Sequence, residues 1–421
     1  MSLVIVGEAI FLLPFVLSRV FRPTFLDVFG ISNLQLGTAF SLYGVVAMFS
    51  YFAGGPLADR FSARRLIVTA MLFTSAGGLL MATIPALGWL TLLYAFWGLT
   101  TIFLFWGALI KTTRELGNSN QGQTFGLLDG GRGLFAAVLS SFSVFVFAAL
   151  LPEDVASATF EQRSAALSII ILIFSGLGLV SALLVWFFVP ESKEPVDVHA
   201  ASRPLINLQS LKQISSMRAV WLQALIILCA YVAYKSTDDF SLYARDAFGY
   251  NEVQAAQIGT LSFWMRPIAA VGVGFLADKL NSQGALLGSF AVVMAGSLVI
   301  STGVLVPGVT WLLFMTIAAT SAGIYGLRGL YFSTLGEARV PLAYTGAAVG
   351  LVSFIGYTPD VFMGPLMGYL LDRTPGAIGH QHVFTVIFAF GLLGFITTLL
   401  FNYTINYAKK AHVVRAAKVS E

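Results

Sequence analysis

Long apolar runs separated by short polar segments make up most of the chain. A helix of about 20 residues can cross a hydrocarbon layer of about 30 Å. Twelve runs reach this length, at residues 3–28, 36–57, 66–86, 88–110, 124–150, 166–189, 219–243, 254–277, 284–304, 309–334, 343–371 and 382–406. The pattern predicts an all-α membrane protein with twelve transmembrane helices, arranged as two pseudo-symmetric six-helix bundles.

The most polar stretch of the chain, residues 191–217, separates the first six runs from the last six. It contains prolines and charges of both signs, as a linker between two halves should. The predicted units are therefore an N-terminal bundle (1–190), a linker (191–217), a C-terminal bundle (218–408) and a tail (409–421).

Composition supports lipid as the main solvent of this chain. Its 421 residues are 57% hydrophobic and 10% charged, whereas soluble domains contain about 25% charged residues. Cys229 is the single cysteine, so neither an intrachain disulfide nor a cysteine metal cluster can form. The first apolar run lacks a basic leading segment and a small-residue cleavage site, so we expect it to be retained as a span.

The basic residues between the runs predict the orientation of the chain. Lys and Arg gather in cytoplasmic loops, and three of them, Arg163, Arg245 and Arg373, occupy the odd-numbered gaps. The even-numbered gaps and the tail carry Arg60, Arg64, Arg65, Lys111, Arg114, Lys193, Arg203, Lys212, Arg218, Lys279, Arg339, Lys409, Lys410, Arg415 and Lys418. Both termini and the linker are therefore expected in the cytoplasm.

One short charged motif occurs twice in this apolar chain. The segments GGPLADRFSARR at 54–65 and GFLADKLNSQG at 274–284 each follow the second run of their half. Glycine permits close helix packing, an aspartate can meet a helix N-terminus, and the basic residues favour the cytoplasmic side. The motif depends on Gly55, Asp59, Arg60, Arg64 and Arg65, and in the second copy on Gly274, Asp278 and Lys279.

This repeated motif resembles the signature of the major facilitator superfamily, and the resemblance extends over essentially the whole chain. The first copy has Ser62 and Ala63 where the family has glycine and a basic residue, and the second copy lacks the final basic pair. The resemblance implies two bundles that rock about a central site by alternating access. It also implies that the motif is a gate that latches the outward-facing state and does not touch the solute.

Eleven ionisable residues fall within the predicted spans, where each charge facing lipid would cost about 2.5–3.5 kcal/mol. Most must therefore face the protein interior or a wet cavity. They are Arg19, Arg22, Arg132, Lys235, Arg266, Arg328, Glu8, Asp129, Asp238, Asp239 and Asp360.

Some of these charges can cancel locally. Asp129 and Arg132 lie three residues apart, and Lys235 precedes Asp238 and Asp239 by three and four. The remaining residues are Arg19, Arg22, Arg266 and Arg328 against Glu8 and Asp360, and Glu8 is expected near the cytoplasmic end, within reach of solvent. This basic excess predicts a small anionic solute, because arginine matches carboxylate and phosphate groups. The alternative is that these arginines pair across helices and serve structure.

Candidate substrate-binding residues follow from this excess and from the tyrosines beside it. They are Arg19, Arg22, Arg132, Tyr231, Tyr234, Lys235, Arg266, Arg328 and Tyr357. Basic residues on both the first and the seventh spans resemble the pattern of organophosphate and related anion exchangers in the superfamily.

Proton coupling needs a buried carboxylate that changes its charge state. Asp360, beside Pro359 in the eleventh span, is the leading candidate, followed by Asp129, Asp238, Asp239 and Glu8. The alternative is a structural partner of Arg132 or Arg328. None of the four histidines (His199, His380, His382 and His412) is expected in the interior of a span, since His382 is only the first residue of the last one, which argues against a histidine relay.

The sequence thus predicts a proton-coupled secondary transporter of a bacterial inner membrane, acting as a monomer, with no enzymatic activity, cofactor, metal or nucleic-acid partner. The chain has no ATP-binding loop of the GxxxxGK[ST] type. An efflux antiporter for amphipathic compounds is the alternative, although the fifth span lacks the proline-containing element of drug antiporters in this family. A membrane enzyme would need clustered acidic or histidine residues at an interface, and a sensor would need a soluble domain.

Overall fold

The computed structural model describes residues 1–117, 121–191, 208–331 and 345–419. The elements of the first half are α1 (Ser2–Ala9), η1 (Leu12–Val16), α2 (Leu17–Val20), α3 (Arg22–Phe29), α4 (Asn33–Arg60), α5 (Ala63–Met81), α6 (Leu87–Gly98), η2 (Leu99–Trp106), α7 (Gly107–Gly117), α8 (Gln121–Leu150), η3 (Val155–Ser157) and α9 (Phe160–Phe188). Capping boxes at Ser32 and Thr159 satisfy the first amide groups of α4 and α9, which fixes where these two helices begin.

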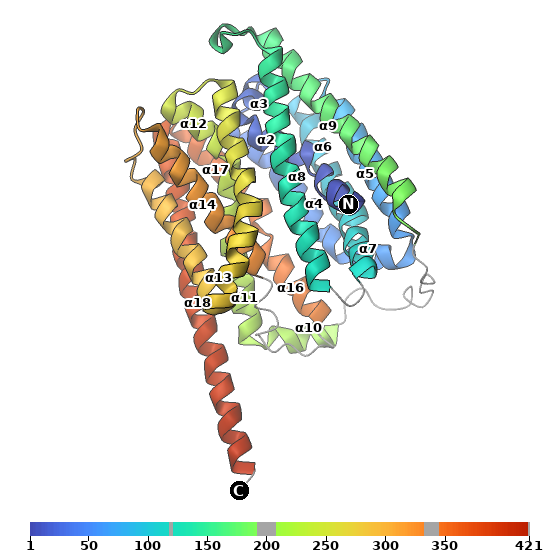
Figure 1. Cartoon of the computed structure of the whole chain (residues 1–421), viewed down its shortest axis with the longest axis vertical. Coiled ribbons are helices and arrows are strands. Elements are labelled where there is room, and N and C mark those ends of the chain that lie inside the picture. The colour runs from blue at the N-terminus through green and yellow to red at the C-terminus, as the bar shows by residue number, and fades with distance from the viewer. Residues whose placement is uncertain (118–120, 192–207, 332–344, 420–421) are drawn as a thin grey trace.

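The second half repeats this helical organisation. Its elements are α10 (Leu208–Ser215), α11 (Arg218–Lys235), η5 (Ser236–Asp238), α12 (Phe240–Phe248), α13 (Glu252–Ser301), α14 (Thr310–Leu330), α16 (Thr345–Gly356), α17 (Pro359–Arg373) and α18 (Ala377–Val419). The helices run side by side along the long axis of the molecule (Figure 1). α10 lies within the segment that the sequence predicts as the linker.

Nine helices of the described residues are long and apolar enough to cross a membrane. The count is ten if the bent pair Ser2–Ala9 and Leu12–Val20 forms one span. The two other predicted spans, 254–277 and 343–371, are also helical: the first lies within α13, and the second is divided between α16 and α17. The prediction of an all-helical membrane fold is therefore confirmed.

Two of the predicted spans are broken near prolines. The bend in the first span is 42°, and it begins just before Pro14, which lies in the π-type segment η1. The second break, at Tyr357 and Thr358, comes just before Pro359, the first residue of α17. Proline lacks the amide hydrogen that a continuous helix would use, so both breaks have a local cause. Side chains of the candidate site lie beside both breaks: Glu8 precedes the first, and Tyr357 and Asp360 lie at the second.

The end of the bundle at which α4 begins is here called the Asn33 end, and the two halves are in contact there through Asn33, Leu34 and Asp372. The opposite end, where α4 finishes, is called the Arg60 end. Both ends of α13 lie at the Asn33 end, since Glu252 pairs with Arg163 at the start of α9 and Gly303 packs on Gln381 near the start of α18. The chain therefore reverses direction within α13.

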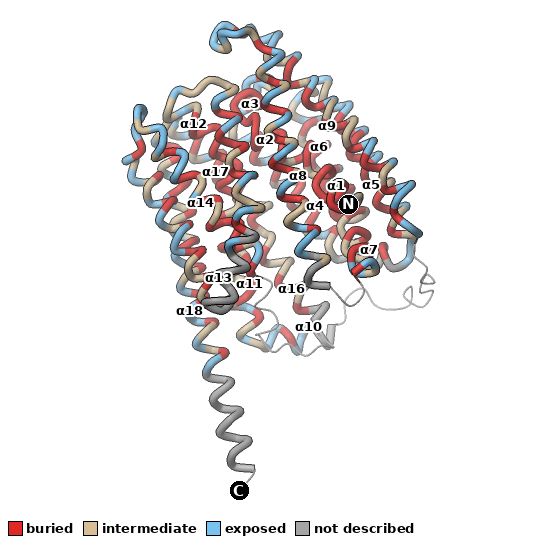
Figure 2. Tube along the Cα trace, in the orientation of Figure 1, coloured by how far each residue is buried: buried red, intermediate tan, exposed pale blue. Residues whose placement is uncertain are grey.

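Large apolar side chains cover the outward faces of the helices. Phe145, Phe187 and Phe188 are each at least 70% exposed, and Figure 2 shows exposed residues along the outer helices with buried residues between them. Such a surface is stable only against lipid, because water would face a continuous apolar belt.

Candidate functional site

Two clusters of charged side chains, buried or nearly buried except for Asp129, join the two halves. The Asp238 cluster contains Arg19, Lys235, Asp238 and Asp360, with Tyr231, Tyr234 and Arg328 around them. The Glu8 cluster contains Glu8, Asp129, Arg132 and Arg266. All of these residues belong to the set predicted from the sequence, so the fold brings most of the predicted site together.

The Asp238 cluster joins α2 of the first half to η5 of the second. The Arg19 guanidinium lies 2.6 Å from Asp238 through Nη2 and 2.7 Å through Nε. Arg19 also donates a hydrogen bond to the Tyr234 hydroxyl, at 3.0 Å. Arg19 is 3% exposed and Asp238 is 5% exposed. A charge pair this deeply buried needs such close geometry to offset the loss of hydration.

Lys235 is shared between two carboxylates. Its Nζ lies 3.1 Å from Asp238 and 3.4 Å from Asp360. Asp360 also accepts a hydrogen bond of 3.0 Å from the Tyr231 hydroxyl. Asp360 therefore pairs with Lys235 and not with Arg132 or Arg328, the two structural partners that the sequence suggested for it. The backbone of Asp360 packs on Gly44 of α4, so this carboxylate lies at the contact between the halves.

Arg328 differs from the other basic residues of the site. Its guanidinium carbon lies 3.9 Å from the centre of the Tyr234 ring and 5.9 Å from that of Tyr231. Within the described part of the chain, Arg328 makes no ion pair. Aromatic faces attract its charge but do not neutralise it, so Arg328 keeps a guanidinium that an anion could pair with.

A belt of tyrosines extends from Arg328 across the contact between the halves. Tyr51 of α4 stacks on Tyr357, with ring centres 5.6 Å apart. Tyr357 in turn meets Tyr231 edge-on at 4.9 Å, and Tyr325 packs on Tyr234. The sequence analysis selects Tyr231, Tyr234 and Tyr357 but misses Tyr51 and Tyr325. The spacing of three residues between Tyr325 and Arg328 could have identified Tyr325, whereas no charge stands near Tyr51 in the sequence.

The Glu8 cluster also joins the two halves. Glu8 of α1 lies 3.2 Å from Arg132 of α8 and 3.2 Å from Arg266 of α13. Arg266 approaches Asp129 to 2.7 Å, whereas Arg132, the expected local partner, stays 3.8 Å away. Glu8 is 4% exposed, so the expectation of a solvated residue near the chain end is wrong. Glu8 faces the protein interior, where it pairs with two arginines.

The expected pair between Lys235 and Asp239 does not form. The Asp239 carboxylate instead faces His380, with Oδ2 2.6 Å from Nδ1. His380 is fully buried and belongs to α18, which begins at Ala377, five residues before the predicted span. The prediction that no histidine lies within a span is therefore wrong for His380 and His382, which both fall within the candidate span Ala377–Asn406. The helix begins early because Gly376, at a φ of +80°, ends the preceding turn.

Arg22 and neighbouring polar groups close the Asn33 end. Arg22 donates to the Asn33 side-chain oxygen and to the backbone oxygen of Asp238. The Asp372 carboxylate of α17 accepts from the backbone amides of Asn33 and Leu34, at 3.1 and 2.8 Å. It therefore caps the N-terminus of α4 from the other half of the molecule, where the helix dipole favours a negative charge.

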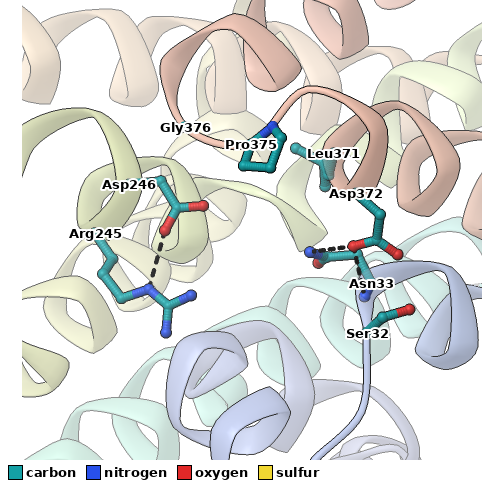
Figure 3. Close-up of a pocket in the computed structure, with 8 residues that line it drawn as sticks. All are labelled: Ser32, Asn33, Arg245, Asp246, Leu371, Asp372, Pro375 and Gly376. Atoms are coloured by element: carbon teal, nitrogen blue, oxygen red, sulfur yellow. Dashed lines mark hydrogen bonds and ion pairs between the residues drawn. The ribbon is translucent and has the colours of Figure 1, made fainter.

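A pocket of about 650 Å³ opens beside these contacts, lined by Ser32, Asn33, Arg245, Asp246, Leu371, Asp372, Pro375 and Gly376. Figure 3 shows Arg245 paired with Asp246 and Asn33 paired with Asp372 on its walls. Burial alone would raise the pKa of Asp246, but hydrogen bonds from His380 and Arg245 and the charge of Arg245 lower it below its ordinary value.

Two arginines of the repeated motif contact their own half. Arg64 and Arg65 pair with Glu191 just beyond α9, at 3.0 and 3.3 Å. The positions Gly55, Asp59, Gly274, Asp278 and Lys279 lie outside the residues whose side chains the structure describes. The gating role of the motif stays a prediction.

A bundle of membrane-spanning helices in two halves, with buried charges where they meet, defines a membrane carrier. A family model described as Major Facilitator Superfamily matches residues 4–359, and the chain belongs to this family of secondary transporters. The resemblance seen in the sequence is thereby confirmed, and the protein is a transporter rather than an enzyme.

Relatives in Escherichia coli strain K12 match nearly the whole chain. Inner membrane protein YqcE is 28% identical over 92% of this chain and 91% of its own length. Inner membrane protein YihN is 24% identical over 97% and 96%. Among solved structures, a mutant form of the nucleoside transporter NupG has a TM-score of 0.73 at 13% identity and covers 95% of this chain and 99% of its own. A bacterial homologue of the lysosomal transporter Spinster has a TM-score of 0.68 at 14% identity, covering 96% of each chain. These likenesses to solved structures establish the shared fold.

Proposed function

We propose that this transporter moves a small organic anion together with a proton by alternating access. The observation that carries the proposal is that the Arg328 guanidinium lies against tyrosine rings and forms no ion pair with any of the residues that the structure describes. An anionic group of the solute would take the position of the absent carboxylate. Arginine suits this role because its planar fork can donate two parallel hydrogen bonds to a carboxylate or phosphate.

The balance of charge around Asp238 supports an anionic solute. Arg19, Lys235 and Arg328 contribute three positive charges, whereas Asp238 and Asp360 contribute two negative charges. The Glu8 cluster, in contrast, holds two arginines against two carboxylates. The solute would therefore restore neutrality at the Asp238 cluster, while the Glu8 cluster is neutral without it.

The remaining predicted binding residues are engaged in contacts inside the protein. Arg19, Lys235, Arg132 and Arg266 each pair with a carboxylate, and Arg22 is bonded to Asn33. We propose that these residues determine the electrostatic potential and the shape of the site. The solute itself would contact Arg328, Tyr231, Tyr234 and Tyr357. The hydroxyl groups and ring faces of these tyrosines would hold the rest of an organic anion.

Asp360 is the proposed coupling residue. It shares Lys235 with Asp238, so protonation of Asp360 would leave Lys235 one carboxylate partner, Asp238, and would increase the positive charge of the cluster by one. Its position against Gly44 links this change to the contact between α17 and α4. Protonation would then loosen one ionic contact at the place where the halves must separate for the site to change sides.

We also propose that the Arg60 end faces the cytoplasm. The excess of basic residues at that end supports this orientation, and with it the location of both termini in the cytoplasm. The names of the two Escherichia coli relatives support the inner membrane as the location of this protein. In this orientation the structure is closed toward the outside, where Asp372 of the second half caps α4 of the first.

The anion hypothesis can be tested with purified protein. Thermal-shift measurements with lactate, gluconate, glucuronate, glycerol 3-phosphate and a cationic dye would be made on wild type, Arg328→Gln and Arg328→Lys. A ligand that binds the folded carrier raises its melting temperature by mass action. We expect an acid from this panel to stabilise wild type and Arg328→Lys, the latter less strongly, but not Arg328→Gln. Arg373→Gln, at an exposed residue, is the control.

Transport in liposomes then separates this hypothesis from an efflux antiporter. The acid that stabilises the protein should accumulate when the outside is acidified, and Arg328→Gln should abolish this accumulation. Stabilisation and extrusion of the cationic dye, with no response to any acid, would overturn the anion hypothesis in favour of the antiporter.

A further inference from the structure

A buried histidine at the Asn33 end contacts a carboxylate through each of its ring nitrogens. His380 Nδ1 lies 2.6 Å from Asp239 Oδ2, and Nε2 lies 3.3 Å from Asp246 Oδ2. The His380 side chain and the Asp239 side chain are fully buried, whereas Asp246 is 24% exposed. The three side chains come from α18, from the start of α12 and from near its end. The proposed roles of Arg328 and Asp360 do not involve them.

The geometry fixes how many protons the ring must carry. A neutral imidazole has one N–H and one lone pair, so one of its nitrogens would direct a lone pair at a carboxylate oxygen. Two facing acceptors repel each other, and the cost is high where water is excluded. A doubly protonated ring donates to both carboxylates and satisfies both contacts. The arrangement is therefore built for an imidazolium.

The surroundings of the ring complete its charge balance. Asp239, Tyr243 and Asp246 face it from α12, with the Tyr243 ring centre 5.2 Å from that of His380. Arg245 lies behind Asp246, with Nε 3.0 Å from its carboxylate, and also reaches Asp27 of α3 at 3.0 Å. Arg245 is shared by Asp246 and the more exposed Asp27. Asp239 has no arginine or lysine partner among the described residues and retains an oxygen, Oδ1, for which the described structure provides no hydrogen bond. A proton on His380 is the charge that balances Asp239.

This histidine has a route to water. Asp246 lines the pocket at the Asn33 end and is partly exposed there, and its Oδ2 faces His380. A proton from pocket water can pass to the Asp246 carboxylate and from there to His380 Nε2. On release, the Nε2 proton returns to Asp246 and then to water, which leaves a neutral ring still bonded to Asp239 through Nδ1.

We propose that His380, held between Asp239 and Asp246, is a proton-binding site of this carrier that exchanges protons with the pocket at the Asn33 end. This site is separate from the coupling role proposed for Asp360. Because Arg245 bonds both Asp246 and Asp27, the site shares a residue with the contact between the halves. Loss of the proton would leave Asp246 more dependent on Arg245, in competition with Asp27.

Nitrogen-15 NMR of the ring gives a direct test. A chain with His199→Gln, His382→Gln and His412→Gln keeps His380 as its single histidine and needs no substitution at the site. This chain, labelled at the histidine ring and held in lipid nanodiscs, should show two N–H groups at pH 6 and pH 7. A ring with one N–H at both pH values would overturn the proposal.

Two variants test the carboxylates and the route. Asp239→Asn in the single-histidine chain removes the charge that the imidazolium balances, so one N–H signal should be lost at pH 7. Asp246→Asn should slow exchange of the ring N–H groups with water, and unchanged exchange would rule out the route through the pocket. Glu153→Gln, at an exposed residue outside the site, is the control for both. If Asp239→Asn does not fold, the single-histidine chain alone decides the protonation state.

The role of Asp360 is tested separately. Asp360→Asn in the single-histidine chain should leave both ring N–H groups in place. If Asp360→Asn loses proton-driven uptake and the NMR spectrum shows a neutral His380 ring, the histidine site is rejected and the proposed function is kept. Two ring N–H groups on His380, together with unchanged uptake in Asp360→Asn, would support the histidine site and reject the proposed coupling role of Asp360.

Discussion

Gly37 and Gly364 face each other where α4 crosses α17, with no room for a side chain between the two helices. A Cβ added to Gly364 would lie 2.7 Å from the Gly37 backbone oxygen, well inside ordinary contact distance. Small residues allow helices to approach in this way within membranes. This crossing, together with Gly44 against Asp360, closes the Asn33 end of the carrier.

Gly364→Ala should hold the halves apart at this end, because backbone must move to admit the new methyl group. Accessibility can be followed with Pro375→Cys, which lines the pocket, in a Cys229→Ser background. We expect a membrane-impermeant maleimide to label Pro375→Cys faster when Gly364→Ala is present. Gly350→Ala is the matched control, since nothing lies within 4 Å of a Cβ at Gly350. Equal labelling rates in all three proteins would contradict the tight crossing.

Lys235→Gln should destabilise the fold, because it leaves Asp238 with Arg19 alone and Asp360 without a cationic partner. Breaking a buried pair by removing one member costs about 3–5 kcal/mol. Adding Asp360→Asn removes the stranded charge and should restore much of this loss, which thermal unfolding of both single variants and the double variant can measure. Additive losses would show that Lys235 and Asp360 do not interact. Lys212→Gln, at an exposed residue, is the control.

Glu8→Gln should destabilise the protein by a similar amount, about 3–5 kcal/mol. It leaves Arg132 and Arg266 with Asp129 as the remaining carboxylate of the Glu8 cluster. Glu161→Gln, at an exposed glutamate in the first turn of α9, should change the melting temperature little. If Glu8→Gln and Glu161→Gln both lower the melting temperature by the same small amount, Glu8 is in contact with solvent and not buried.

Asp246 should contribute to stability in a pH-dependent way. Its pKa is lower in the folded protein than in the unfolded chain, so the unfolded chain takes up its proton first as the pH falls. The stabilisation is therefore complete above the unfolded value of about 3.9 and is lost as the pH falls through the folded value. Melting temperatures of wild type and Asp246→Asn should differ most near pH 6 and converge toward pH 3. If the difference in melting temperature between the two proteins instead grows as the pH falls, the pKa of Asp246 is raised and not lowered by folding.

The fold could be predicted from the sequence because one physical quantity, the length of apolar runs, determines which segments can cross a membrane. The repeated motif then identified the family. The breaks before Leu12 and before Pro359 were harder to predict, because proline can either end a helix or lie within one, as Pro267 does in α13. Prediction therefore located the spans but not where they are interrupted.

The sequence predicted which charged residues belong to the site but not which of them form ion pairs with each other. The cost of burying charge identified Arg19, Lys235, Asp238 and Asp360, which do lie together. Sequence spacing alone suggested Asp239 as a partner of Lys235, but α18 supplies His380, 141 residues away. Glu8 was placed near solvent because its partners come from α8 and α13, and only the packing of three helices brings them together.

The contact of Arg266 with Glu8 and Asp129 bears on the motion that alternating access would require. Both acids belong to the first half, and α13 belongs to the second. If α13 separated from α1 and α8 here, Arg266 would lose its contacts with the buried Glu8 and with the more exposed Asp129, at a cost of several kcal/mol. The low-cost motion keeps these helices together and opens the molecule elsewhere. The seam between α8 and α13 would then act as the fulcrum of the transport cycle, and rotation about it would move the Gly37 crossing most.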